Sequence, residues 1–172
     1  VYLFDQHVPT ATAAGIDTAV WMRIDYKVNA YRPTLPGRIA PELKLTDKNG
    51  TLTSLYDFKA KYTLLYFFSP LCGHCQEVTP QIYEASLPYA EKGVRVFAVT
   101  TEIPEDIWKS YLAEKVPEWT CVLETEKPSQ VEKIYATHTL PNVMLLDENK
   151  KILIRRLPVS EIPKVLENIA GQ

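Results

Sequence analysis

Apolar and polar residues alternate along the chain in blocks that predict a series of strands. Two continuous apolar runs, residues 62–68 (YTLLYFF) and 95–100 (RVFAVT), are typical of central strands covered on both faces. Strand-like segments flank turn-forming residues twice, which predicts hairpins over residues 42–54 and 142–156. A further short strand is expected at residues 119–123. The chain therefore contains enough strands for one central sheet.

Helical segments separate these strands. The predicted helices cover residues 72–90, 104–115, 129–136 and 160–169, with Pro80 inside the first and Ser160 capping the last. The resulting order β-β-β-α-β-α-β-α-β-β-α predicts an α/β fold. We expect a mixed central sheet with helices on both faces and an added N-terminal β-hairpin.

The first forty residues differ from the rest of the chain. Residues 1–32 carry only a weak helical pattern, around residues 13–26, and are too few to enclose a core. Three prolines and a glycine follow within ten residues, which disfavours a helix and favours an extended linker. We expect residues 1–32 to be the truncated C-terminal tail of a preceding domain, residues 33–41 a linker, and residues 42–172 the folded domain.

Composition narrows the possible functions. The chain has 172 residues, of which 46% are hydrophobic and 23% charged, which is typical of a globular domain. Its net charge of −2 predicts no nucleic-acid partner, and no apolar run approaches the length of a membrane span. Three cysteines are too few for a disulfide scaffold, so we expect cysteine used in chemistry or metal binding.

The segment Cys72-Gly73-His74-Cys75 follows a predicted buried strand and begins a predicted helix. A helix start offers unpaired N–H groups and the positive end of the helix dipole, which favour the thiolate of Cys72. The thiolate is the nucleophile in disulfide exchange. Gly73 keeps the turn unobstructed, and His74 adds a partly positive group that should favour the reduced form. Cys75 is one turn further on, where it can attack Cys72 and release a mixed disulfide.

Two other uses of the pair are open from the residues alone. The pair could form half of a structural zinc site, which needs two more ligands. Only Cys121 and three histidines are available for this, and none forms a second paired motif. An inert structural disulfide is the other alternative. Cys121 stands alone and is interpreted as a small buried hydrophobic residue.

Several segments around the pair follow a recognisable order. They are Ala40-Pro41-Glu42-Leu43 before a hairpin, Tyr66-Phe67-Phe68-Ser69-Pro70-Leu71 before the pair, Pro80, and Thr139-Leu140-Pro141-Asn142 before a strand. From Arg38 onwards the chain thus resembles the thioredoxin superfamily, in particular TlpA/ResA-like bacterial envelope proteins. The resemblance implies a thioredoxin fold and exchange with cysteines of other proteins, without a cofactor. It also implies an upstream redox partner protein and a periplasmic or envelope-exposed location in a Gram-negative bacterium.

The resemblance also assigns residues beyond the pair. Pro141 matches the cis-proline of the family, so Leu140 would present its backbone to an incoming peptide, whereas an ordinary trans-proline is the alternative. Two carboxylates of the family are missing, because Tyr66 and Val78 occupy their positions. We interpret Tyr66 as core packing or as a group that orders a water. Glu102, just past a predicted strand, is the candidate proton carrier.

Two further functions remain as alternatives. A copper-binding metallochaperone would use Cys72, Cys75 and His138, although the spacing within the pair argues against it. A peroxidase of the peroxiredoxin type carries Pro-x3-Thr-x2-Cys at its nucleophile. Here Ser69 falls at the Thr position, but Leu65 occupies the Pro position.

Overall fold

A central sheet of seven strands organises the fold of the computed structural model, which describes residues 15, 17–101, 103–116, 118–126 and 128–171. The strands are β1 (Lys44–Asp47), β2 (Leu52–Ser54), β3 (Tyr62–Phe67), β4 (Val94–Thr101), β5 (Thr120–Glu124), β6 (Asn142–Asp147) and β7 (Ile152–Ile154). The helices are α2 (Thr18–Tyr31), α3 (Gly73–Ser86), α4 (Glu105–Lys115), α5 (Gln130–Tyr135) and α6 (Ile162–Ala170). Short 3-10 turns form η2 (Arg32–Thr34), η3 (Leu87–Tyr89) and η4 (Val159–Glu161).

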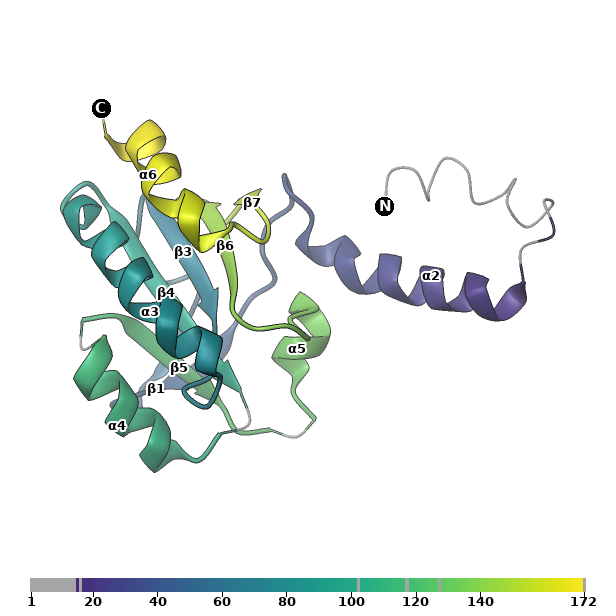
Figure 1. The fold of residues 1–172 in the computed structure, drawn as a ribbon, viewed down its shortest axis with the longest axis horizontal. Coiled ribbons are helices and arrows are strands. Elements are labelled where there is room, and N and C mark those ends of the chain that lie inside the picture. Colours follow the sequence, from purple (N-terminus) through teal and green to yellow (C-terminus); the bar gives the residue numbers. More distant parts are fainter. Residues whose placement is uncertain (1–14, 16, 102, 117, 127, 172) are drawn as a thin grey trace.

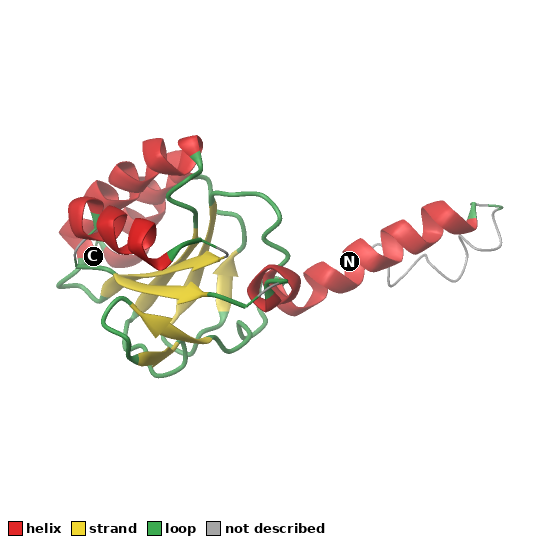
Figure 2. Ribbon diagram, turned by 90° about the horizontal axis from the view of Figure 1, so that it is seen from below, coloured by secondary structure: helices red, strands yellow, loops and turns green. Residues whose placement is uncertain are grey.

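The sheet is mixed, with strand order β2-β1-β5-β4-β3-β6-β7. Strands β3, β4 and β5 are parallel, whereas β1, β2, β6 and β7 each pair antiparallel with their neighbours. Helices lie on both faces of this sheet (Figure 1, Figure 2). The predicted α/β class, the two hairpins and the order of elements are therefore confirmed, and the carboxyl ends of the parallel strands meet at one edge.

Two hydrophobic cores cover the two faces of the sheet. The larger core lies against α3, α4 and α6 and includes Cys75, Ile82, Trp108, Leu112 and Leu166. The smaller core lies against α5 and the segment before β3. Alternate residues of β3 enter opposite cores, because side chains alternate across a strand, which explains its continuous apolar run. The prediction of a central strand covered on both faces is confirmed.

Some predicted local features are wrong. Ser160 does not cap the last helix, because it lies within η4 and α6 begins two residues later without a side-chain cap. Pro104 is the N-cap of α4 rather than its first residue. The start of the predicted extended segment is helical, since Arg32–Thr34 forms a 3-10 turn with Thr34 buried. A proline is compatible with the first turn of a helix, where its missing N–H is not needed.

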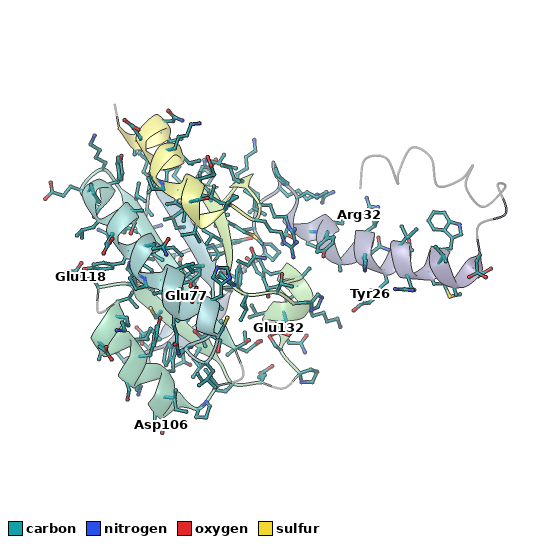
Figure 3. The ribbon with its side chains drawn as sticks, in the orientation of Figure 1. Tyr26, Arg32, Glu77, Asp106, Glu118 and Glu132 are labelled. Atoms are coloured by element: carbon teal, nitrogen blue, oxygen red, sulfur yellow. The ribbon has the colours of Figure 1, made fainter. Side chains whose placement is uncertain are left out.

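Helix α2 projects away from the sheet, and its Tyr26 side chain points to solvent (Figure 1, Figure 3). Asp17 caps the helix by accepting hydrogen bonds from the N–H groups of Ala19 and Val20. None of its residues is buried. The Arg155 guanidinium lies over the ring of Tyr31, 4.5 Å from its centroid. The weak helical pattern in the sequence thus marks a real helix that makes few contacts.

Residues 37–40 pair with residues 150–152, at the start of the outer strand β7. The Gly37 N–H donates to the Ile152 carbonyl over 2.7 Å, and the Ile152 N–H donates to the Arg38 carbonyl over 2.8 Å. Ile39 forms a bridge with Lys151, and Ala40 is fully buried. The end of the proposed linker is therefore fixed on the sheet. None of the described helices is long and apolar enough to cross a membrane.

Candidate active site

Cys72 occupies the N-cap of α3, at the carboxyl edge of the parallel strands. Ser69 and Pro70 end strand β3, and the Cys72 N–H donates to the Ser69 carbonyl over 3.0 Å. The Cys72 sulfur accepts a hydrogen bond from the Cys75 N–H at 3.4 Å. A sulfur in this position takes the place of the oxygen that usually caps a helix. The unpaired N–H groups of the first turn and the helix dipole stabilise negative charge on it.

Cys75 lies one turn further on and is fully buried in the larger core. Burial raises the pKa of its thiol to about 12, and the nearby Cys72 adds to this rise. The backbone of Ser69 and the hydroxyl of Tyr66 oppose it to a smaller extent. Both cysteines are free thiols in this structure. The pair is therefore asymmetric, with one half-buried sulfur at a helix end and one sheltered sulfur below it.

The two residues between the cysteines face outward. Gly73 and His74 are both exposed. A Cβ atom on Gly73 would have no heavy atom within 4 Å, so crowding within the chain does not require glycine there. The expectation that Gly73 relieves an intramolecular obstruction is therefore not supported by the geometry. Its missing side chain leaves space only toward an approaching partner.

A groove runs beside the pair, between α3 and the loop before β6. The Leu140–Pro141 peptide bond is cis, as the sequence predicted. The groove has a volume of about 520 Å³ and has one wall from α3, one from the Pro141 loop and one from the segment around η4. Its lining residues are His74, Glu77, Val78, Gln81, Leu140, Pro141, Val143, Leu157, Val159 and Ser160. The structure thus brings His74, Leu140 and Pro141, which were predicted as site residues, to one surface, with Glu77 exposed on α3 (Figure 3).

Below the pair lies a layer of buried hydroxyl groups. The Tyr66 and Thr79 hydroxyls are 2.9 Å apart, and the Thr79 hydroxyl donates to the Cys75 carbonyl over 2.6 Å. Tyr66 was a candidate from the sequence, whereas Thr79 and Tyr111 of α4 were not. Thr79 was detectable, because it follows Cys75 by four residues and so shares its helix face. Nothing in the sequence links Tyr111 to the pair.

Of three other residues singled out in the sequence, two lie elsewhere in the fold and one is outside the described residues. His138 lines a separate pocket with residues of α2, and Cys72, Cys75 and His138 do not form a ligand cluster in the described part of the chain. The copper site built on these three residues is therefore wrong as a geometric arrangement. Glu102 lies outside the described residues. Cys121 is buried on β5, and burial raises its pKa to about 12, in line with its predicted role as a hydrophobic residue.

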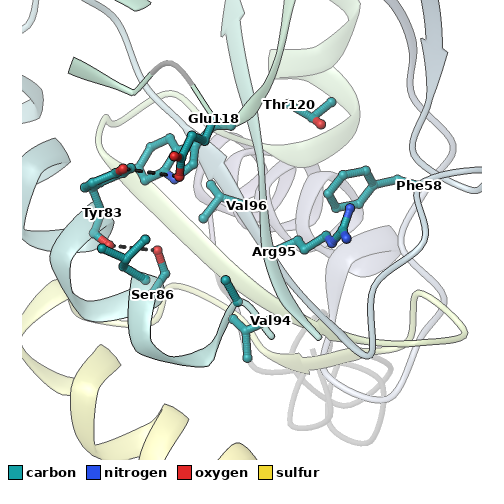
Figure 4. A pocket seen from close by; sticks show the side chains of 11 residues that line it. Phe58, Tyr83, Ser86, Val94, Arg95, Val96, Glu118 and Thr120 are labelled. Carbon is teal, nitrogen blue, oxygen red and sulfur yellow. Dashed lines mark hydrogen bonds between the residues drawn. The ribbon is translucent and has the colours of Figure 1, made fainter. Parts of the chain in front are cut away.

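A second cavity, of about 210 Å³, lies at the other end of α3 (Figure 4). Tyr83 and Ser86 line it from the last turns of the helix, and Val94 lines it from the start of β4. The Tyr83 hydroxyl donates to the Glu118 carboxylate over 3.3 Å. Tyr83 follows Cys72 by eleven positions, which places this cavity about 16 Å along the helix from Cys72. It is not part of the candidate active site.

Comparison with known proteins places this geometry in a family. A family model described as AhpC/TSA family matches residues 36–157. Thiol-disulfide oxidoreductase ResA of Bacillus thuringiensis subsp. konkukian is 27% identical over 117 residues, covering 68% of this chain and 66% of that relative. The chain thus spans just under two thirds of the length of that relative.

Solved structures give the same assignment. A domain of a possible thiol-disulfide isomerase from Cytophaga hutchinsonii is 34% identical, with a TM-score of 0.72, covering 79% of this chain and 93% of that one. The thioredoxin domain of a thiol-disulfide oxidoreductase from Bacteroides vulgatus is 28% identical, with a TM-score of 0.73, covering 79% and 98%. The resemblance seen in the sequence is confirmed, and the chain belongs to the AhpC/TSA family within the thioredoxin superfamily.

Proposed function

We propose that this chain is a thiol–disulfide oxidoreductase that exchanges disulfides with cysteines of other proteins, with Cys72 as the attacking sulfur. The asymmetry of the pair carries this proposal. Cys72 is partly accessible at the N-cap of α3, whereas Cys75 is buried and its pKa is raised to about 12. A thiolate at a helix N-terminus is the form that attacks disulfides. The names of the relatives support the same activity.

The reaction follows from these positions. The Cys72 thiolate attacks a substrate disulfide, forms a bond to one substrate sulfur and expels the other as a thiolate. Cys75 then attacks the Cys72 sulfur, which forms the Cys72–Cys75 disulfide and releases the substrate with both cysteines reduced. Two electrons pass from the pair to the substrate, and the reverse sequence oxidises a substrate dithiol. We propose that a separate redox partner protein returns the pair to its starting state, and this partner sets the direction.

The groove beside the pair suits an extended peptide. Its floor and walls include apolar side chains such as Val143 and Val159, and its rim carries His74 and Glu77. An extended segment that lies along Leu140 and Pro141 would place its sulfur next to Cys72, with backbone hydrogen bonds supplying affinity. We therefore propose protein substrates rather than small thiols as the physiological partners.

Trapping of the intermediate tests the assignment of roles. In Cys75→Ser, the second attack is lost, so a mixed disulfide through Cys72 should accumulate with an oxidised protein substrate. Cys72→Ser should accumulate none, and Cys121→Ala should behave as wild type. Mass spectrometry after an acid quench identifies the linked cysteine. Accumulation in Cys72→Ser rather than Cys75→Ser would reverse the roles, and accumulation in neither would refute the proposed exchange.

We also propose that residues 1–32 end a preceding domain, which the linker joins to residues 42–172.

We further propose that the protein works in the periplasm or on another envelope-exposed surface. The resemblance to TlpA/ResA-like proteins supports this location. A fusion of the full-length protein to alkaline phosphatase tests it, because that enzyme needs disulfides that form outside the cytosol. An inactive fusion that is nevertheless expressed would contradict the proposal.

A further inference from the structure

Among the described residues, no buried charged side chain lies in the core around Cys75. Glu124 and Lys150 are the buried charged side chains in the described part of the chain. Glu124 accepts hydrogen bonds from the start of α5, and the Lys150 ammonium donates to the Phe58 carbonyl, so both serve the opposite face of the sheet. A sulfur that must become a nucleophile in an apolar core needs a donor, because an unpaired buried charge is costly.

Three neutral hydroxyls lie where such a donor is needed. Tyr66 is fully buried on β3 and hydrogen-bonds with Thr79, four residues after Cys75 on α3. The Tyr66 hydroxyl also lowers the pKa of the Cys75 thiol, against the larger raising effect of burial. The ring of Tyr66 is held by stacking on Phe68, with ring centroids 5.0 Å apart. The Tyr66 hydroxyl is therefore fixed beside Thr79, whose own hydroxyl bonds the Cys75 carbonyl.

The direction of these hydrogen bonds follows from counting protons. Thr79 has one hydroxyl proton, and it is donated to the Cys75 carbonyl over 2.6 Å. In the Tyr66–Thr79 bond, Tyr66 must therefore be the donor, which leaves a lone pair of its oxygen to accept from the Cys75 thiol. This arrangement suits the thiol. A Cys75 thiolate instead requires the Tyr66 O–H to turn toward the sulfur.

Tyr111 completes the alternative arrangement. Its hydroxyl is buried and has no hydrogen-bond partner among the described residues. Burial raises the pKa of Tyr111, and the nearby Thr79 side chain opposes that rise. When Tyr66 turns toward sulfur, the Thr79 oxygen loses a donor, and the Tyr111 O–H can replace it. In this second arrangement the Tyr111 hydroxyl gains the partner that it lacks in the first, as is usual for buried polar groups.

We propose that Tyr66 donates a hydrogen bond to the Cys75 sulfur during the second step of exchange, with Thr79 and Tyr111 completing the hydroxyl network. The inference rests on the proposed function. In that step Cys75 releases its proton, its sulfur bonds to the Cys72 sulfur, and the bond from Cys72 to the substrate sulfur breaks. The departing substrate sulfur takes up one proton, so the step is balanced without an external acid, base or oxidant.

Tyr66→Phe tests the proposal, since it removes one hydroxyl and keeps the ring. Release of a cysteine-containing peptide from its mixed disulfide with Cys72 is followed by rapid acid quench and mass spectrometry. We expect release to slow about tenfold, which corresponds to about 1.4 kcal/mol. The rate of Cys72 alkylation by iodoacetamide should stay within twofold of wild type. Tyr83→Phe is the matched control, because its hydroxyl lies at the other end of α3.

The outcomes separate this proposal from the proposed function. A wild-type protein that forms no mixed disulfide would overturn both. A wild-type protein that forms and releases one, together with an equally fast Tyr66→Phe or an equally slow Tyr83→Phe, would overturn the donor role alone. If Tyr66→Phe does not fold, Tyr111→Phe decides, because its hydroxyl has no partner at rest and its loss should leave stability intact. We expect that variant to release about threefold more slowly, and wild-type release would overturn the proposal.

Discussion

Helix α3 has a concave surface beside each of its ends. At its N-terminal end, the groove lies between the first turns of α3, the Pro141 loop and η4, and several of its walls are apolar. At its C-terminal end, a smaller cavity lies between Tyr83, Ser86 and the start of β4 (Figure 4). Arg95 and Glu118 also line this second cavity. Both concavities are thus formed against the same helix.

The two ends differ in the polarity of the backbone and in what stands at the cap. The N-terminus presents N–H groups and a cysteine, whereas the C-terminus presents carbonyl groups and continues directly into η3. N–H groups stabilise a thiolate, and carbonyls do not. The comparison teaches that a cavity alone does not mark the site. The groove is a candidate site because it lies beside a nucleophile at a helix N-terminus.

The strongest test of this contrast fills each concavity in turn. Ser160 and Leu87 are both exposed, lie in 3-10 turns and line the two concavities. Ser160→Trp should lower kcat/KM for a protein disulfide about tenfold, because the ring occupies the path of the peptide, a loss of about 1.4 kcal/mol. Leu87→Trp should leave kcat/KM within twofold of wild type. Equal losses in both variants would contradict the assignment of the groove.

A smaller effect is expected inside the motif. His74→Pro removes an imidazole that can carry positive charge beside Cys72 and is compatible with the first turn of α3. The reduced pair should lose stabilisation, so the reduction potential should fall by ~15 mV, about threefold in the equilibrium constant with glutathione. Solvent screening limits the size, because His74 is exposed. His138→Asn is the control and should leave the reduction potential unchanged. If His74→Pro also leaves the potential unchanged, the helix N-terminus alone accounts for the stabilisation of the reduced pair.

The smallest effect on exchange is expected at Cys121, which is next to Thr120 of the second cavity. Burial raises its pKa from 9.0 to about 12, so the folded protein keeps this thiol protonated while the unfolded chain loses the proton above pH 9. Folding stability should therefore fall as the pH rises from 9 to 12. Cys121→Ala should flatten this fall in urea unfolding of the reduced protein and leave exchange at pH 7.5 unchanged. An identical pH slope in both proteins would contradict the burial of this thiol.

Periodicity and the position of the cysteines were enough to predict most of the fold and the centre of the site. Strand β3 was predictable because both of its faces are buried, and Cys72 because it follows that strand directly. The Leu140–Pro141 bond was correctly predicted as cis from the resemblance.

The remaining features depend on contacts between segments that are distant in sequence. The Tyr66–Thr79 hydrogen bond joins residues 13 positions apart, and Tyr111 reaches the same place from another helix. No local sequence pattern predicts such contacts. The copper site with His138 was wrong for the same reason, because the position of α2 determines which residues surround His138. Ser160 was predicted to cap the last helix because serine generally favours an N-cap. The prediction was wrong because the chain first makes a 3-10 turn there.

The pairing of residues 37–40 with β7 has a consequence for the behaviour of the protein at high concentration. The outer strand of a sheet normally offers free N–H and carbonyl groups, to which a second chain can add. Here the N–H of Ile152 and its carbonyl are both used by the segment before β1. The opposite outer strand, β2, is only three residues long. The segment before β1 thus covers the start of β7, and the shortness of β2 limits pairing at the opposite border.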